Sequence, residues 1–230
     1  MLKFSGCTFS AAGADKKAKV YGLTLTGTEE TLIEDCSFNG TGYAALLNKS
    51  EGTVVIKNSV FECGNIYNPI EGTQTEDQGN LTVENCDFIG VPGNNFINFY
   101  RVADNTVHTI KNCKFRGASN NNIIRLSNRN DCSAIFNVEN IDYDFVSGTP
   151  DEYSGMILCQ DYTAKNGAPQ NFSLYTVNLK NIKGPENVQY LYSYQDGEGI
   201  ITGNRPALTI DGQPVVFGSG ESMIEEDGDF

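Results

Sequence analysis

The chain has 230 residues, of which 39% are hydrophobic, and its formal net charge is -13. Such a chain is typical of a folded globular protein with a hydrophobic core. Because only 16 residues are Lys or Arg against 29 Asp or Glu, a clustered basic surface for nucleic acid is not expected. No apolar run approaches the ~18 residues of a membrane span, and the opening MLKFSGCTFS is no signal peptide.

A six-residue pattern recurs along most of the chain at steps of 23 to 41 residues. Periods of this length with β-branched residues predict a solenoid whose successive coils pair in parallel. The copies are FSGCTF (4–9), IEDCSF (33–38), IKNSVF (56–61), VENCDF (83–88), IKNCKF (110–115), VENIDY (138–143) and LKNIKG (179–184).

Each position of the pattern has its own predicted role. The third position holds Asn58, Asn85, Asn112, Asn140 and Asn181, which suit a left-handed bend with amides stacked between coils. Alternation then turns the fourth and sixth positions inward, as a structural ladder in a dry core. These inward residues include Cys36, Cys86, Cys113, Phe38, Phe61, Phe88 and Phe115.

Charged residues beside the asparagines test this alignment independently. The second position alternates in sign through Glu34, Lys57, Glu84, Lys111, Glu139 and Lys180. The fifth position does the same through Asp87, Lys114, Asp142 and Lys183. Stacked coils lie ~4.8 Å apart, so alternation replaces repulsion by attraction of about 0.2–1 kcal/mol per pair.

A second strand is expected in most coils, separated from the first by Gly- and Asn-rich turns. About seven to eight coils over residues 1–218 would form one domain, followed by an acidic tail, 219–230. Loops are expected at 70–80 and 161–170, and a hairpin at 207–218. The second strands are YAALLN (43–48), NNFINF (94–99), NNIIRL (121–126), SGMILC (154–159) and VQYLYS (188–193).

The ladder [IV]-[EK]-N-C-x-F resembles the right-handed, single-stranded parallel β-helix of the pectate-lyase-like superfamily, over roughly residues 1 to 200. The resemblance implies an all-β fold. It leaves function open, because this fold carries polysaccharide lyases and hydrolases, adhesins, and phage tailspike or head-decoration proteins.

Cysteine and histidine chemistry is possible but not favoured by the pattern. Seven cysteines, an odd number, argue against a complete disulfide framework, and the repeat makes most of them small core fillers rather than zinc ligands. His108, the single histidine, aligns with apolar Leu81 and Phe136, so a packed ring is favoured over a general base. No cofactor or metal is expected.

The best alternative for a catalytic site is a cluster in the turns after the second strands. It gathers two aspartates, which suit glycoside hydrolysis, and three of the five arginines, which suit an acidic sugar. Pairing of these charges with one another, for a purely structural purpose, is the other interpretation. The cluster comprises Arg101, Asp104, Arg125, Arg129 and Asp131.

Function is expected to be structural rather than enzymatic. The rod is short, its loops are few, and its first coil needs a cover, either from residues 11–20 or from a partner. The favoured hypothesis is a phage-type virion protein, assembled in the host cytoplasm, that decorates a capsid or tail. Its partners would be other virion subunits or further copies of itself, with Met223, Ile224 and Phe230 of the tail as contacts.

The alternative hypothesis is a polysaccharide lyase, glycoside hydrolase or adhesin that meets a surface glycan. Tyr190, Tyr192 and Tyr194 alternate along one strand, and would form an aromatic platform if they faced outward and core if they faced inward. An open groove with converging carboxylates would favour the enzyme.

Overall fold

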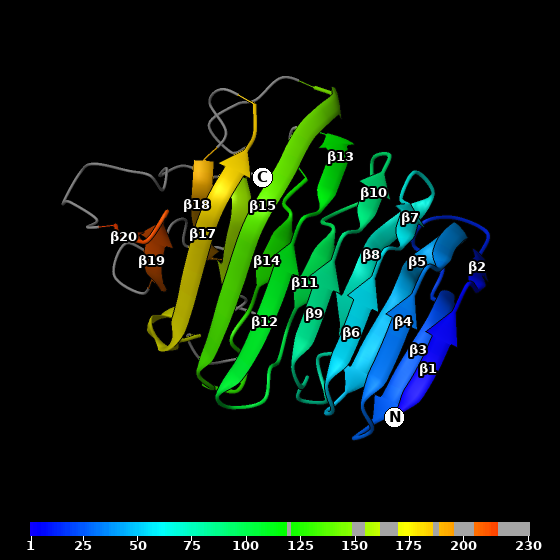
Figure 1. Cartoon of the computed structure of the whole chain (residues 1–230), viewed down its shortest axis with the longest axis horizontal. Helices are drawn as coiled ribbons and strands as arrows, with labels where there is room; N and C mark the ends of the chain where they lie inside the picture. Colours follow the sequence, from blue (N-terminus) through cyan, green and yellow to red (C-terminus); the bar gives the residue numbers. More distant parts are fainter. Residues whose placement is uncertain (119–120, 149–154, 162–169, 186–188, 196–204, 216–230) are drawn as a thin grey trace.

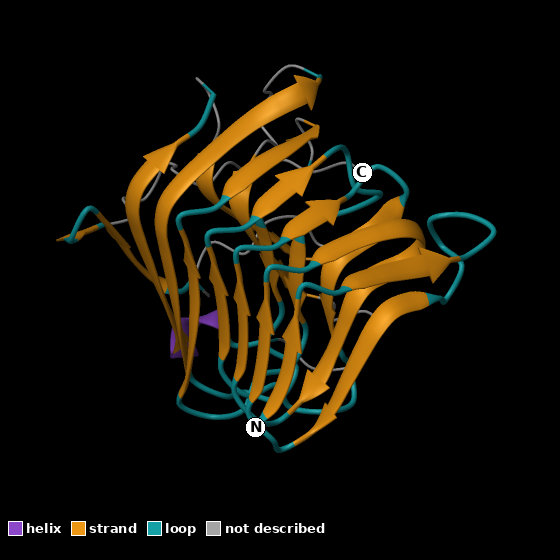
Figure 2. Cartoon of the chain, turned by 45° about the vertical axis from the view of Figure 1, so that its right-hand side comes forward, coloured by secondary structure: helices purple, strands orange, loops and turns teal. Residues whose placement is uncertain are grey.

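A computed structural model describes residues 1–118, 121–148, 155–161, 170–185, 189–195 and 205–215. Nearly all of its strands pair in parallel with strands one repeat away, so that they wind into three rows (Figure 1, Figure 2). This confirms an all-β, parallel, β-helix-like solenoid. The short 3-10 helix η1 (Phe172–Leu174) precedes β17.

The first row holds the strands that precede the asparagine position of each repeat. Its pairings match the predicted alignment residue for residue, for example Glu84 opposite Lys57 and Lys111. The row runs through β1 (Leu2–Ser5), β4 (Thr31–Glu34), β6 (Val54–Lys57), β9 (Leu81–Glu84), β12 (Thr106–Lys111), the first parts of β15 (Ala134–Ser147) and β17 (Tyr175–Lys183), and β19 (Ala207–Ile210).

The second and third rows complete each coil. The second row comprises β2 (Thr8–Ala12), the start of β5 (Ser37–Ser50), β7 (Val60–Glu62), β10 (Asp87–Ile89), β13 (Lys114–Ala118) and the end of β15. The third row comprises β3 (Tyr21–Gly27), the end of β5, β8 (Ile66–Gly72), β11 (Ile97–Phe99), β14 (Ile124–Leu126), β16 (Gly155–Asp161) and β18 (Gln189–Gln195). These include the five predicted second strands, and β3 and β8 are added to them.

The structure changes the bounds of one predicted loop and supports the predicted hairpin. Residues 70–72 belong to β8, so the first loop covers only 73–80. Within the second loop, residues 162–169 lie outside the described part of the chain. The hairpin is confirmed where it is described, since β20 (Gln213–Pro214) pairs antiparallel with β19.

The asparagine position bends the chain as predicted. Asn58, Asn85 and Asn112 have φ of 49°, 55° and 54°, in the left-handed region. Their amides also join the coils, because Asn85 Nδ2 donates to Asn58 Oδ1 at 3.2 Å and Asn112 Nδ2 to Asn85 Oδ1 at 3.0 Å. Asn therefore supplies both the backbone angle and the contact between coils.

Substitution at Asn112 separates these two contributions. Asn112→Ala loses both side-chain hydrogen bonds, to Asn85 and from Asn140, and places alanine at a strained positive φ. We therefore expect a loss of ~2 kcal/mol in the free energy of unfolding. Asn112→Gly loses the same hydrogen bonds, but glycine tolerates the positive φ, so a loss of about 1 kcal/mol is expected. Urea unfolding followed by circular dichroism measures both, and equal losses would show that the angle contributes nothing.

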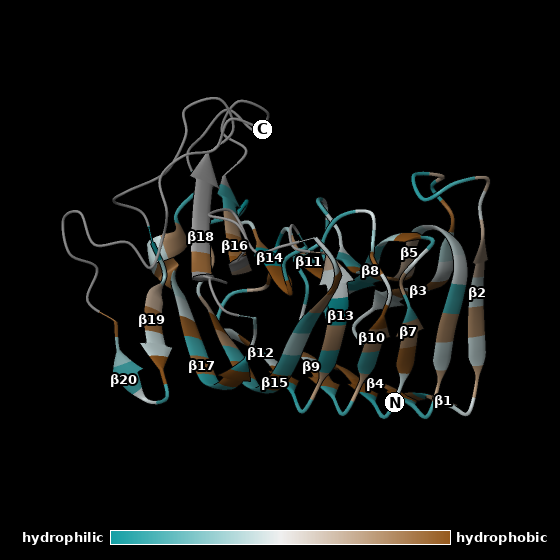
Figure 3. Cartoon of the chain, turned by 90° about the horizontal axis from the view of Figure 1, so that it is seen from above, coloured by the Kyte–Doolittle hydropathy of each residue, from teal (hydrophilic) through white to brown (hydrophobic). Residues whose placement is uncertain are grey.

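The aromatic ladder is continuous in the core. Phe38, Phe61, Phe88 and Phe115 stack with ring centroids 4.4 to 4.6 Å apart and interplanar angles of 1° to 11°. All four side chains are fully buried. In Figure 3 hydrophobic and hydrophilic bands alternate along β15 and β17, as expected for strands with one face in the core.

The charge ladder forms ion pairs between coils. Glu84 lies 3.8 Å from Lys57 Nζ and 3.1 Å from Lys111 Nζ, and Lys180 contacts Glu139 at 2.9 Å. In the fifth position the alternation is present, but Asp142 is paired with Arg116 at 2.7 Å. The register expected from charge is therefore correct.

Residues 11–20 do not lie over the first coil. Lys16 Nζ donates to the carbonyl of Val91 at 3.2 Å, and Lys17 lies 5.8 Å from the ring centre of Tyr67. These contacts place the segment beside later coils. Phe4 and Phe9 of the first coil are only half-buried.

Candidate functional site

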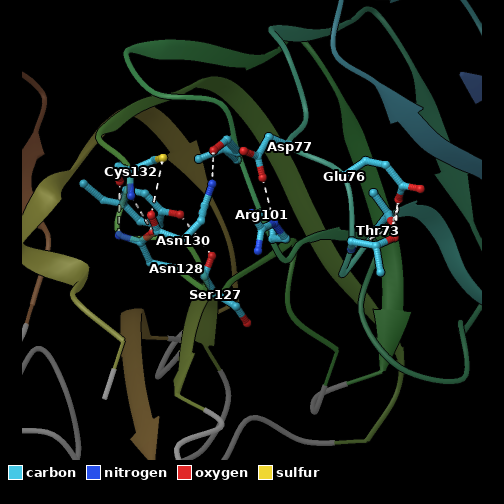
Figure 4. Close-up of polar contacts among 11 residues, drawn as sticks. Thr73, Glu76, Asp77, Arg101, Ser127, Asn128, Asn130 and Cys132 are labelled. Atoms are coloured by element: carbon cyan, nitrogen blue, oxygen red, sulfur yellow. Dashed lines mark hydrogen bonds and ion pairs between the residues drawn. The ribbon is translucent and has the colours of Figure 1, made fainter. Parts of the chain in front are cut away.

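The predicted Arg/Asp cluster lies where β8, β11 and β14 end and the chain turns back to the first row (Figure 4). Arg101 does not reach Asp104. Its Nε contacts Asp77 Oδ1 of the 73–80 loop at 2.7 Å. Arginine–aspartate pairing at this turn is thus present, but with a partner that the sequence interpretation did not name.

The two aspartates of the cluster have separate positions. Asp104 Oδ1 accepts hydrogen bonds from the Ser133 hydroxyl at 2.7 Å and the Ser133 amide at 2.9 Å. These bonds hold the pKa of the Asp104 carboxyl below its usual value. Asp131 is exposed and has a φ of 50°, which makes it a turn residue. Both roles are structural.

The same turn is fixed by amides and hydroxyls. Asn128 Nδ2 donates to the carbonyl of Cys132 at 3.1 Å, and Asn130 Nδ2 donates to that of Val102 at 2.8 Å. Thr73 donates a short hydrogen bond to Glu76 in the neighbouring loop (Figure 4). Most polar groups shown here hold turns to one another.

The other two arginines meet on one aromatic ring. The guanidinium carbons of Arg125 and Arg129 lie 4.8 Å and 5.0 Å from the ring centre of Tyr100. Arg129 Nη1 also donates to Gln74 Oε1 at 2.8 Å. Arg125 is 5% exposed, so the five predicted residues are divided between a buried aromatic contact and surface turns.

Arg125 leads to a carboxyl that the sequence interpretation missed. Glu71 in β8 is opposite Asn98 in β11, and Asn98 is opposite Arg125 in β14. Asn98 Nδ2 donates to Glu71 Oε2 at 2.8 Å, and both side chains are buried. A loop is expected at Glu71, but IYNPIEG (66–72) aligns with the next second strand at the same 27-residue step, and this alignment is the sequence signal for β8.

Burial dominates the electrostatics of this column. It raises the pKa of Glu71 to about 7, against the opposing effects of the Asn98 hydrogen bond and the Arg125 charge. Burial also raises the pKa of the nearby Tyr43 to about 12, and the Glu71 charge adds to that shift. A carboxyl that titrates near neutral pH can give or take a proton, which is a property of general acids.

His108 and the cysteines are structural. His108 is fully buried between Phe99 and Phe136, with ring centroids 4.7 and 4.9 Å away, and burial lowers its pKa to about 3. All seven cysteines are free thiols. The ladder cysteines donate to the carbonyl two residues earlier, for example Cys86 to Glu84 at 3.3 Å. Burial raises the pKa of Cys63 and Cys132, which opposes thiolate chemistry.

Some predicted contacts cannot be located. Met223, Ile224 and Phe230 lie outside the described residues, as do the side chains of Tyr190, Tyr192 and Tyr194. Within the described part of the chain there is no group of three or more His, Cys, Asp or Glu residues arranged to hold a metal ion. The described residues also contain no helix long and apolar enough to cross a membrane.

Comparison of the chain with protein-family models, curated proteins and solved structures gave no match. The described residues form an all-β parallel solenoid, and the carboxyl of Glu71, buried in the third row, has a pKa of about 7.

Proposed function

We propose that this protein is a non-enzymatic structural component of a virion, a right-handed parallel β-helix of seven to eight coils from the pectate-lyase-like superfamily, that decorates a phage capsid or tail. The observation that supports it best is the use of the Arg/Asp cluster in holding turns together. Arg101 is neutralised by Asp77, and Asp104 is bound by Ser133.

Catalysis by paired carboxylates requires two carboxyl groups that converge on one substrate bond. Asp104 and Asp131 do not act as such a pair, because one is fixed to Ser133 and the other is exposed in a turn. A rod that is held rigid by ladders of amides, aromatic rings and ion pairs suits a structural role in a large assembly. With its net charge of -13, the protein would be attracted to basic surfaces of neighbouring subunits.

Density-gradient purification of particles from cells that make the protein tests this proposal. The full chain should sediment with the particles in a constant copy number, measured by quantitative mass spectrometry. A chain that lacks residues 219–230 should remain folded but lose this association, because the tail carries the proposed contacts Met223, Ile224 and Phe230. Full-length protein found only in the particle-free fraction would refute the virion role.

A carbohydrate-active protein is a second candidate, favoured by one observation. Glu71 combines a pKa of about 7 with an adjacent amide, Asn98, and with Arg125, whose guanidinium suits an acidic sugar. Incubation with uronate-containing polysaccharides, followed at 235 nm and by reducing-end release, tests it. Activity that disappears in Glu71→Gln but persists in Glu62→Gln would replace the structural proposal with this one.

A further inference from the structure

From β4 to β17 the outer face of the first row carries two adjacent columns without charge, and Lys3 on β1 lies opposite Leu32 at the edge of this surface. One column has Leu32, Val55, Thr82, Thr109, Asn137 and Asn178 at successive strands, and the other has Thr53, Asn80, Val107, Ile135 and Thr176. In a chain with 20% charged residues, so long an uncharged surface is unusual.

This uncharged surface is open and partly apolar. Val107 and Ile135 lie opposite each other on β12 and β15, and each is 40% exposed. The residues of the other column are half-buried, as expected for side chains that stand on the outside of a sheet. Figure 1 looks onto this row, and no described segment crosses in front of β6, β9 and β12.

A charged column borders the uncharged surface. It is the alternating series from Glu34 to Lys180, six residues on six successive strands. Because the number of members is even, the series read backwards has the opposite sign at every position. A second copy placed antiparallel would therefore meet it with opposite charges throughout, whereas a parallel copy in register would meet like charges.

We propose that this face binds a second copy of the chain, with the two rods antiparallel and a two-fold axis between β9 and β12. Glu84 then faces the partner's Lys111, Lys57 faces the partner's Glu139, and Glu34 faces the partner's Lys180. An isologous contact of this kind requires a self-complementary surface, which the reversed alternation provides.

The pairs within each chain leave the lysines of the charged column accessible. The side chains of Lys57, Lys111 and Lys180 are 42%, 37% and 65% exposed although each contacts a glutamate of its own chain. In the uncharged columns, Thr82 would meet the partner's Thr109, and Asn80 would meet the partner's Val107. No like charges meet anywhere across the three columns on β6, β9, β12 and β15.

The size of the face sets the expected strength. Six strands at ~4.8 Å and three columns two residues apart cover roughly 500–600 Å² on each copy. This is near the lower end for specific interfaces, so a weak dimer is expected, with dissociation in the micromolar range. Because charges at the border contribute, its affinity should fall as salt rises.

Sedimentation equilibrium of the full chain from 5 to about 500 μM, in low and high salt, tests the proposal. The wild type should dimerise in ~50 mM NaCl, and the dissociation constant of the dimer should be at least tenfold higher in ~500 mM NaCl. Glu84→Lys should weaken the dimer more than tenfold, since each copy then sets a second lysine against the partner's Lys111. Thr109→Arg should abolish it by placing two charges beside the two-fold axis.

The double variant Glu84→Lys/Lys111→Glu is the matched control. It restores opposite charges between the two copies. Within one chain, the charged column then has two adjacent pairs of like charge, the same number as in Glu84→Lys alone. Recovery of the dimer would therefore show that Glu84→Lys acts on the contact between copies and not on the stability of each chain. Thermal unfolding of each variant measures that stability in parallel. Glu62→Lys, an exposed site in the second row with the same change of charge, should have no effect.

A wild type that stays monomeric at the highest concentration in low salt would overturn the proposal. So would a dimer that survives both Glu84→Lys and Thr109→Arg, since its interface would then lie elsewhere. Failure of the double variant to recover, with its fold intact, would contradict the antiparallel arrangement.

Discussion

Glu71→Gln is expected to stabilise the protein at pH 8 by ~3 kcal/mol and to leave its stability at pH 4 almost unchanged. The pKa of this buried carboxyl is about 7 in the folded chain, against a usual value of 4.5. Between these values the folded chain holds a proton that the unfolded chain has lost. Stability therefore falls as pH rises through that window and stays reduced above pH 7.

Glutamine removes the titration but keeps a carbonyl that can accept from Asn98 Nδ2, as Glu71 Oε2 does. The free energy of urea unfolding of the wild type and Glu71→Gln, measured at pH 4, 6, 7 and 8, should give two curves that diverge above pH 5. Glu62→Gln, at an exposed site, should follow the wild type within about 0.5 kcal/mol. If Glu71→Gln is instead the less stable protein at pH 8, the ionised carboxyl is stabilised by Arg125 more than burial penalises it.

The first and second rows of the fold could be predicted from sequence because three signals coincide where the chain passes from one row to the next. Asn112 marks the bend, Phe115 the core position and Lys111 the charge on the outside, and each repeats in the neighbouring coils. Since a one-residue slip would reverse every side chain, agreement among the three fixes the register. The structure pairs Lys111 with Glu84 and stacks Phe115 on Phe88 as expected.

The third row has a weaker sequence signal, and for that reason Glu71 is not predicted as a site residue. The outward column of its strands changes from Leu47 through Glu71 and Asn98 to Arg125, so no residue type repeats. The acidic and glycine residues that follow Glu71 favour a polar loop rather than a strand. A buried carboxyl on an outward column depends on what covers that column, which local sequence does not encode.

The Arg/Asp cluster shows the opposite difficulty. The sequence places Arg101 and Asp104 in one charged cluster, but the Asp104 carboxylate is bound by Ser133. Arg101 instead meets Asp77, 24 residues earlier and one coil away, at 2.7 Å. In a solenoid the nearest neighbours of a surface residue are one repeat away, so contacts between coils decide which charges are neutralised.

Phe88→Ala is expected to destabilise the fold by about 3–5 kcal/mol, the largest loss from any single substitution considered. The ring is fully buried and stacks on Phe61 and on Phe115, each with a centroid distance of 4.6 Å. Phe96 contacts the same ring at 5.9 Å in an edge arrangement. Alanine leaves a cavity in the middle of the column that the strands above and below, held by ladders of Asn85 and Glu84, cannot close.

The position of Phe88 within the column makes this prediction specific. Phe9 stacks face to face on a single ring, Phe38, at 5.0 Å and is half-buried at the first coil, so Phe9→Ala should cost less than half as much. Phe88→Leu, which fills part of the cavity, should fall between the two. Urea unfolding gives the losses, and hydrogen exchange should show amides near Phe88 opening first in Phe88→Ala. Because a solenoid is stabilised by contacts between neighbouring coils, equal losses for Phe9→Ala and Phe88→Ala would mean that neither the greater burial of Phe88 nor its second stacking partner adds to stability.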